Sequence, residues 1–244
     1  MNEPFAGLVA HEAAYRLIRD CFDDLALVLT GSFARGAADR WSDLDLSVCV
    51  PASRWAEVIE RVHETLAALP ETFAHFPADH LNLPHLFISC LELCDTVVKV
   101  DLEVVSDEGV TQVTGSIPFW NWDGLMNRAC GWTWYTFTKI QRGELFEAGE
   151  GLDLLRGRAV LPLWQEILGL PREGFRHAEE RLSKTLQQQL WNSRPQSGSA
   201  GELHRCLNLL FQLVDQAWAE RSSTPHRGLK ILSRVMPRER SCAL

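Results

Sequence analysis

Two aspartates follow a Gly-Ser step at a spacing that suits phosphate chemistry. In LTGSFARGAADRWSDLDLSV, residues 29–48, Gly31 and Ser32 end an apolar run, and Asp43 and Asp45 come after ten intervening residues. Carboxylates at positions i and i+2 of a strand point to the same side and repel each other unless a cation lies between them. Small residues after a strand let backbone N–H groups approach a phosphate, and Ser32 adds a hydroxyl. The pattern predicts magnesium held by the two aspartates beside a bound phosphate.

A third acidic position lies in the apolar stretch VVKVDLEVV, residues 97–105. Asp101 sits in its middle, and Glu103 lies two residues on and faces the same side of a strand. Lys99 falls on that side too, so it either pairs with a carboxylate or contacts a substrate. Three carboxylates with magnesium fit in-line attack on a nucleoside triphosphate, because two ions about 3.5–4 Å apart stabilise the attacking and leaving oxygens.

The elements that must position these residues are strands and helices in the first half of the chain. Periodicity predicts a small mixed sheet with helices, the last two strands forming a hairpin that turns near Cys94 and Asp95. The expected helices are residues 6–21, 33–39 and 52–69, and the expected strands are 25–31, 44–50, 86–93 and 96–106.

The second half reads as helical. GSIPFWNWDG, residues 115–124, is rich in turn formers and predicts a linker. Pro162 is expected to start or kink a helix. The expected helical stretches are 125–148, 151–170, 172–193 and 201–222. We therefore expect an α+β fold with two domains, a catalytic domain over residues 1–112 and an all-α substrate-binding domain over 113–244.

The charge distribution restricts the partners. Residues 1–110 hold 19 acidic and 7 basic residues, and the remainder holds 13 and 17, for a net charge of −8. Nucleic-acid binders show a basic stripe, so nucleic acid is disfavoured as a partner. An acidic half favours a metal or a cationic second substrate, although solvated helix faces also explain much of the excess.

The distribution of apolar and charged residues predicts neither a membrane span nor a signal peptide. No apolar run is long enough to cross a bilayer, and the start of the chain lacks the basic and apolar regions of a signal peptide. The seven cysteines are scattered without zinc-ligand spacing. These observations predict a cytoplasmic protein without a membrane partner.

The motif resembles that of a known family. Gly31-Ser32, ten intervening residues and Asp43-Leu44-Asp45-Leu46 are similar to the signature of the DNA polymerase beta-like nucleotidyltransferase superfamily. SDLDL and the Arg35-Gly36 step are typical of its small-molecule branch, which includes the aminoglycoside and lincosamide nucleotidyltransferases. The resemblance covers residues 24–106 by motif and the helical half by architecture alone. Many relatives in this branch pair, so the resemblance leaves a homodimer open.

The resemblance implies roles for individual residues. Asp43 and Asp45 would bind Mg²⁺, and Ser32 would contact the triphosphate of ATP or another nucleoside triphosphate. A third carboxylate, matched most simply by Asp101, would be a metal ligand or the general base, with Glu103 as its rival. Arg35 on the short helix is a further candidate for phosphate contact.

Candidates in the helical half are less specific. Lys139 and Arg142 are three residues apart and share a helix face, so they either reach the triphosphate across a cleft or form a solvated basic face. Glu144 either holds a cationic acceptor or acts as a base, or it is an ordinary exposed residue. Trp132 and Trp134 either stack on a substrate ring or pack in the core.

Together these features predict an enzyme that transfers a nucleoside monophosphate, foremost AMP from ATP, to a hydroxyl of a small molecule and releases pyrophosphate. An aminoglycoside-like acceptor suits the acidic first half, and a lincosamide suits the aromatic helix. The alternative is an antitoxin-type nucleotidyltransferase with a helical module that acts on or binds a protein. Helical toxins of that kind carry R-x4-6-H in a helix, and the chain offers no clear instance.

Overall fold

The structure is a computed structural model that describes residues 5–108 and 120–236. The backbone contacts divide the chain into two compact units, Met1–Trp120 and Asn121–Leu244. The boundary expected at residues 112 and 113 falls outside the described residues, so the assignment of catalysis to one domain and of substrate binding to the other stays a prediction. The α+β class is confirmed, with a mixed sheet followed by a helical region.

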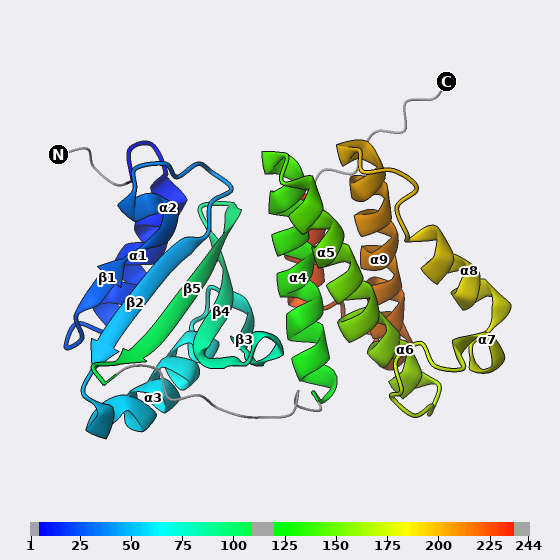
Figure 1. Ribbon diagram of the computed structural model, residues 1–244, viewed down its shortest axis with the longest axis horizontal. Coiled ribbons are helices and arrows are strands. Elements are labelled where there is room, and N and C mark those ends of the chain that lie inside the picture. Colours follow the sequence, from blue (N-terminus) through cyan, green and yellow to red (C-terminus); the bar gives the residue numbers. More distant parts are fainter. Residues whose placement is uncertain (1–4, 109–119, 237–244) are drawn as a thin grey trace. The chain divides into compact units, whose positions relative to one another are not determined.

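Unit 1 is built on a five-stranded sheet in the order β1-β2-β5-β4-β3 (Figure 1). Only β2 and β5 are parallel, and the other neighbours are antiparallel. The strands are β1 (Leu27–Leu29), β2 (Leu44–Val50), β3 (Thr72–Ala78), β4 (Leu83–Leu93) and β5 (Thr96–Ser106). The helices are α1 (Val9–Cys21), α2 (Gly31–Ala34) and α3 (Trp55–Ala68), with 3-10 turns at Ala52–Arg54 and Asp79–Leu81.

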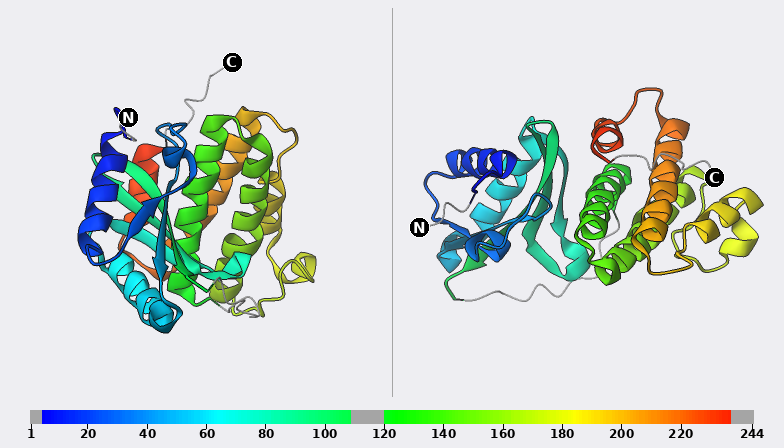
Figure 2. Two further views of the ribbon diagram at one scale, coloured as in Figure 1. Left: turned by 60° about the vertical axis from the view of Figure 1, so that its left-hand side comes forward. Right: turned by 90° about the horizontal axis from the view of Figure 1, so that it is seen from above.

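One face of the sheet carries the hydrophobic core. Along β2, Leu44, Leu46, Val48 and Val50 are buried, and Asp45 lies on the opposite side, as the alternation of a strand requires. The apolar stripes of α1 and α3 pack in the same cluster as these side chains. Figure 2 shows both helices on that face of the sheet. The opposite side of β2 and β5 carries Asp45 and, on β5, Lys99, Asp101 and Glu103.

Two features of this unit differ from the expected elements. β3 was not expected, because Pro77 within a run argues against a central strand. The structure places β3 at the edge of the sheet, where proline is tolerated, with a register shift between Pro77 and Ala78. The helix expected over residues 33–39 is instead the four-residue α2, which starts earlier, at Gly31.

Both residues of the predicted hairpin turn have left-handed backbone. Cys94 has φ 49° and Asp95 has φ 58°, a pattern typical of a two-residue turn between twisted antiparallel strands. The turn joins β4 to β5 and fixes their register, in which Ile88 faces Asp101. The expected hairpin is confirmed.

Unit 2 is helical in its described residues. Its long helices α4 (Trp122–Arg142), α5 (Leu145–Leu155) and α9 (Ala200–Arg221) lie side by side (Figure 1). The other elements are a π-helical turn (Arg156–Val160), α6 (Leu161–Ile167), α7 (Ala178–Arg181), α8 (Lys184–Asn192) and α10 (Arg227–Val235).

Two expected helices are each divided. The helix expected over residues 125–148 was wrong, since α4 ends at Arg142 and Gly143 adopts φ 74°, the left-handed cap that glycine favours. The helix expected over 172–193 was also wrong. In the structure this stretch forms two helices, α7 and α8. The second begins after Ser183, whose side chain accepts a hydrogen bond from the Leu186 N–H. Pro162 stands at the start of α6, as expected.

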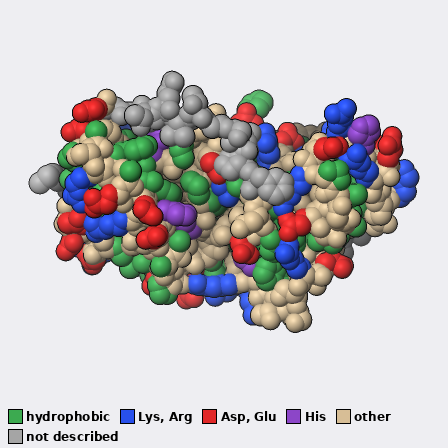
Figure 3. Space-filling model, turned by 90° about the horizontal axis from the view of Figure 1, so that it is seen from below, with side chains coloured by type: hydrophobic (Ala, Val, Ile, Leu, Met, Phe, Trp, Pro, Cys, Tyr) green, Lys and Arg blue, Asp and Glu red, His purple; other side chains and the backbone are tan. Residues whose placement is uncertain are grey.

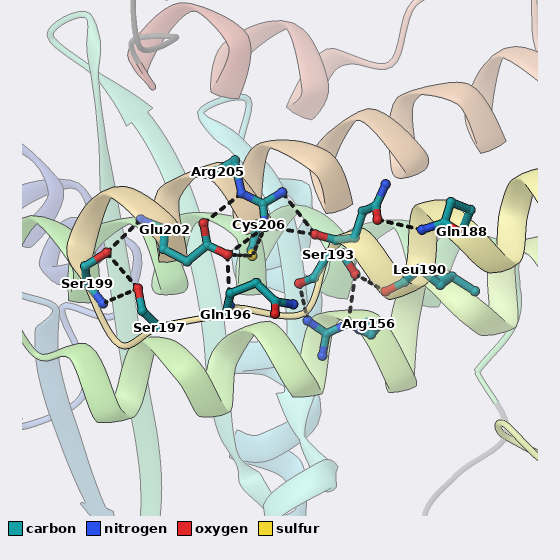
Figure 4. A network of polar contacts seen from close by, with 11 residues as sticks. Arg156, Gln188, Leu190, Ser193, Gln196, Ser197, Ser199, Glu202, Arg205 and Cys206 are labelled. Atoms are coloured by element: carbon teal, nitrogen blue, oxygen red, sulfur yellow. Dashed lines mark hydrogen bonds and ion pairs between the residues drawn. The ribbon is translucent and has the colours of Figure 1, made fainter.

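A buried arginine ties the π-helical turn to the end of α8. Arg156 is 3% exposed, and its Nε donates to Ser193 Oγ over 2.9 Å (Figure 4). A second guanidinium nitrogen donates to the Ser193 carbonyl, and a third donates to Asp153. Ser193 Oγ in turn donates to the Leu190 carbonyl. These bonds give the buried guanidinium the partners that it needs.

We predict that Arg156→Ala lowers the free energy of unfolding by about 2–4 kcal/mol, because it leaves a void and an unpaired carbonyl. Arg158→Ala is the matched control, since Arg158 lies in the same π-helical turn and is exposed. Urea denaturation followed by circular dichroism at 222 nm measures both. Equal losses in the two variants would show that the Arg156 network does not stabilise the unit.

Candidate active site

The parallel pairing of β2 and β5 brings two of the predicted carboxylates together. Asp45 stands directly opposite Asp101 in the register of these strands. Asp43 is the residue just before β2, whose first residue is Leu44. Side chains that are paired across neighbouring strands and face the same side lie within reach of one another. The sheet thus gathers the three aspartates from segments more than fifty residues apart in the sequence.

A lysine ammonium lies between two of these carboxylates. Lys99 Nζ is 3.0 Å from Asp43 Oδ2 and 2.6 Å from Asp101 Oδ2, and the lysine is buried. Lys99 and Asp101 are two residues apart on β5 and share a face of the sheet. Of the two sequence-based readings of Lys99, the pairing with a carboxylate is confirmed. The chain itself therefore supplies one positive charge between Asp43 and Asp101, and the magnesium expected on Asp43 and Asp45 stays a prediction.

The charges in this cluster shift the pKa values in a consistent way. Burial alone would lower the pKa of Lys99, but attraction to Asp101 and Asp43 outweighs it and raises the pKa, so the ammonium stays charged at neutral pH. Burial raises the pKa of Asp101 above its ordinary value. The Lys99 ammonium opposes that rise, and the Asp43 and Asp45 carboxylates add to it. A carboxylate with a raised pKa is a stronger base, which suits proton abstraction near neutral pH.

Gly31 makes room for the Asp45 carboxylate. It has φ 59°, and a Cβ at this position would lie 1.8 Å from Asp45 Oδ2. The Thr30 N–H, one residue earlier, donates to the Asp45 carbonyl over 2.9 Å, which holds the end of β1 against β2. Glycine is therefore required here by both the backbone angle and the close approach.

Ser32 and Arg35 lie on and just after α2. Ser32 is partly buried within the four-residue helix, and Arg35 is exposed at the C-cap. So short a helix has little macrodipole, and a phosphate contact here would depend on the N–H groups and the Ser32 hydroxyl. The phosphate-contact roles of Gly31, Ser32 and Arg35 stay predictions.

His11 contacts the backbone next to Asp43, a contact that the sequence did not reveal. It is 4% exposed on α1, and its Nε2–H donates to the Ser42 carbonyl over 3.0 Å, next to Asp43. Its ring centroid is 5.1 Å from that of Phe33 in α2. Burial lowers the pKa of His11, although the Ser42 hydrogen bond and Asp43 oppose this effect. In sequence it is a lone histidine on an amphipathic helix, with no signal of a contact 31 residues away.

Glu103 points to a different partner from the aspartates. It stands opposite Ser47 on β2, and its Oε1 is 3.4 Å from Nε2 of the buried His85. Its side chain is 39% exposed, against 20% for Asp101. The general-base role of either residue stays a prediction, but Asp101 alone of the two contacts Lys99 and faces Asp45.

The candidates in unit 2 form ion pairs with one another. Lys139 Nζ is 2.7 Å from Glu144 and 2.8 Å from Glu147, and Arg142 is 3.2 Å from Glu144. The predicted contacts of Lys139 and Arg142 with the triphosphate, and of Glu144 with the acceptor, stay predictions. Of the two readings of the aromatic helix, burial favours core packing, with Trp132 at 3% and Trp134 at 2% exposed; a contact with substrate is not tested.

The carboxylates suit a hard divalent cation that also binds phosphate. Within residues 5–108 and 120–236 there is no cluster of three or more His, Cys, Asp or Glu side chains placed to hold a metal by themselves. Mg²⁺ is usually bound by one or two carboxylates with waters and substrate phosphates rather than by a complete protein cage. The buried Asp101 Oδ1 has no hydrogen-bond partner in this part of the chain, which leaves an oxygen for a cation. The donor set therefore fits Mg²⁺.

The surface charges are mixed in sign. On the face drawn in Figure 3, basic and acidic side chains are interspersed and form no continuous basic stripe among the described residues. None of the helices in the described parts of the chain is long and apolar enough to cross a membrane.

Comparison with known protein families finds a match to part of unit 1. Residues 16–88 match the family described as Nucleotidyltransferase domain, a span that includes Gly31, Ser32, Asp43 and Asp45. The match supports the nucleotidyltransferase superfamily and a transferase that moves nucleoside monophosphates. It does not reach the branch that modifies antibiotics. A search of curated proteins finds no significant match to the chain.

We predict that Gly31→Ala lowers the transferase rate by about 100-fold, because the new methyl group displaces the Asp45 carboxylate. Gly36→Ala is the matched control, since Gly36 has φ 67° and a Cβ added there would meet nothing within 4 Å. Alanine is strained in the left-handed region at both positions, at a cost of about 1–2 kcal/mol. Only the methyl group at position 31 would contact Asp45. Initial rates at saturating nucleotide separate them, and equal rates in the two variants would refute the role given to Gly31.

We also predict that His11 makes stability fall in mild acid. Its pKa in the folded state lies below the unfolded value of about 6.5, so the unfolded chain binds more protons between the two values. Stability is therefore complete above a pH of about 6.5 and is lost as the pH falls through the window below it. His11→Gln, which can still donate to the Ser42 carbonyl, should reduce the fall of the melting temperature between about pH 7.5 and 5. The rest of the fall would come from groups such as His226, whose pKa is also lowered by burial.

The control for His11 is the exposed His177, which adopts φ 59°. Asparagine tolerates that backbone angle, so His177→Asn should keep the pH dependence of the unmodified chain. An unchanged slope in His11→Gln, measured by differential scanning fluorimetry, would contradict the assignment.

Proposed function

We propose that the chain transfers a nucleoside monophosphate, foremost AMP from ATP, to a hydroxyl of a small molecule in the presence of magnesium and releases pyrophosphate. The observation that carries the proposal is the convergence of Asp43, Asp45 and Asp101 beside Gly31. Carboxylates that repel one another are kept together where a cation and a phosphate have to be held. The family match over residues 16–88 supports the same reaction class.

The residues divide the chemistry between them. Asp43 and Asp45 would hold Mg²⁺, which when bound offsets the charge of the triphosphate. Gly31 and Ser32 would contact the phosphates. The acceptor oxygen attacks the α-phosphorus, the bond from that phosphorus to the bridging oxygen breaks, and pyrophosphate leaves. The hydroxyl proton passes to Asp101, whose pKa is raised by burial.

A cationic acceptor such as an aminoglycoside suits the charge of the unit that carries the aspartates. The excess of 12 acidic residues over residues 1–110, 19 against 7, attracts positive ligands and steers them toward the site. The lincosamide alternative depended on exposed aromatic rings in α4, and the burial of Trp132 and Trp134 makes it weaker. A metabolite with amino groups would satisfy the same charge, so antibiotic resistance is one setting for this chemistry among others.

The test is pyrophosphate release from each of the four ribonucleoside triphosphates with Mg²⁺, against panels of aminoglycosides, lincosamides and amino-sugar metabolites. We expect release that requires one acceptor class and falls by about 100-fold or more in Asp45→Asn. Asp95→Asn is the matched control, because it removes a carboxylate from the β4–β5 turn of the same unit, and asparagine accepts its left-handed backbone.

The outcomes separate the parts of the proposal. Release that persists in Asp45→Asn would place the chemistry elsewhere. Magnesium-dependent nucleotide binding without release on any small acceptor would overturn the small-molecule acceptor and keep the nucleotide site. The absence of nucleotide binding, measured by isothermal titration calorimetry, would overturn the reaction itself.

A further inference from the structure

Lys99 places a positive charge between two carboxylates, where a nucleotidyl-transfer site would otherwise need a metal ion. Its ammonium bridges Asp43 Oδ2 at 3.0 Å and Asp101 Oδ2 at 2.6 Å. Asp101 belongs to β5, and Asp43 immediately precedes β2, the neighbour of β5 in the sheet. An ion that bridged these two carboxylates in the same way would have to use the same oxygens.

A buried lysine needs such a setting. Lys99 is 5% exposed, and an ammonium removed from water is tolerated only where negative charges and hydrogen bonds replace the solvent. Asp43 keeps its second oxygen, Asp101 keeps a buried Oδ1 without a hydrogen-bond partner among the described residues, and Asp45 stands opposite Asp101. A divalent ion that avoids the Oδ2 atoms contacted by Lys99 would be held through the second oxygen of Asp43 and the Asp45 carboxylate.

Two divalent ions and the ammonium do not fit together in this cluster. A two-metal site places its ions about 3.5–4 Å apart, bridged by shared carboxylates. A metal that bridged Asp43 and Asp101 would compete with Lys99 for their Oδ2 atoms and would be repelled by its charge. A metal on Asp45 and the remaining oxygen of Asp43 would not compete for those atoms.

We propose that the Lys99 ammonium takes the place of one of the two cations of a two-metal site, so that the chain binds a single divalent ion with its nucleotide. Asp43 and Asp45 would hold that ion, and Lys99 would supply the second positive charge between Asp43 and Asp101. This inference rests on the proposed function, because it concerns the metal content of the nucleotide complex.

The test counts the metal ions in that complex. The full chain is dialysed to equilibrium against Mn²⁺ and the ATP analogue with a methylene group between its α- and β-phosphorus atoms. Manganese and nucleotide retained above the protein-free chamber give the ions bound per bound nucleotide. We expect a ratio of one for the unmodified chain and for Lys99→Arg, which keeps the charge.

Lys99→Met keeps the length of the side chain and removes its charge, and we expect it to bind two manganese ions per nucleotide. Without metal it should melt at a lower temperature than the unmodified chain, because the aspartates then repel one another. Manganese should raise its melting temperature by more than it raises that of the unmodified chain. Lys99→Gln serves as a second neutral variant if Lys99→Met does not fold.

A ratio of two in the unmodified chain would overturn the inference and leave the proposed function intact. A ratio of one in a folded neutral variant would also overturn it, because Lys99 would then not be what keeps a second ion out. No retention of nucleotide would instead count against the proposed function.

Discussion

The repulsion among three carboxylates is the constraint on which the site in unit 1 depends. Asp43, Asp45 and Asp101 lie together only because β2 and β5 run parallel and in register, and the apolar side chains on the other face of the sheet fix that register. A slip of one residue would turn the aspartates toward the core, where charges without partners are costly. The hydrophobic packing of α1 and α3 thus maintains an arrangement that the aspartates alone would oppose. Lys99 offsets part of their repulsion within the chain.

Two contacts from other elements also restrain the aspartates. Gly31 leaves space that the Asp45 carboxylate fills, and His11 holds the Ser42 carbonyl just before Asp43. These contacts restrain the aspartates by steric fit and by a neutral hydrogen bond, without adding charge. An acidic cluster restrained in this way is suited to hold a metal and a triphosphate beside its internal counter-ion.

Much of this arrangement was predictable from the sequence because it follows local rules. Alternation indicated β2 with Asp45 on the polar side, and the apolar runs around Cys94 and Asp95 indicated the hairpin that ends in β5. The bridge by Lys99 was only one of two readings, because its partner Asp43 becomes a neighbour only when the register of β2 and β5 is known. The His11 contact depends on tertiary packing and left no local pattern. β3 was missed because Pro77 argues against a strand unless the strand is known to lie at an edge, and the end of α4 at Gly143 was missed because a single glycine does not exclude a helix.

The most direct test of the central claim, that Asp43 and Asp45 at the start of β2 hold the metal of a nucleotidyl-transfer site, is an anomalous difference map. Crystals of the full chain would be grown with Mn²⁺ and a non-hydrolysable triphosphate analogue, and data would be collected above and below the manganese absorption edge. We predict an anomalous peak in contact with Asp43 and Asp45, beside the triphosphate and with Lys99 still against Asp101. A triphosphate bound elsewhere, or a manganese peak away from both aspartates, would contradict the claim.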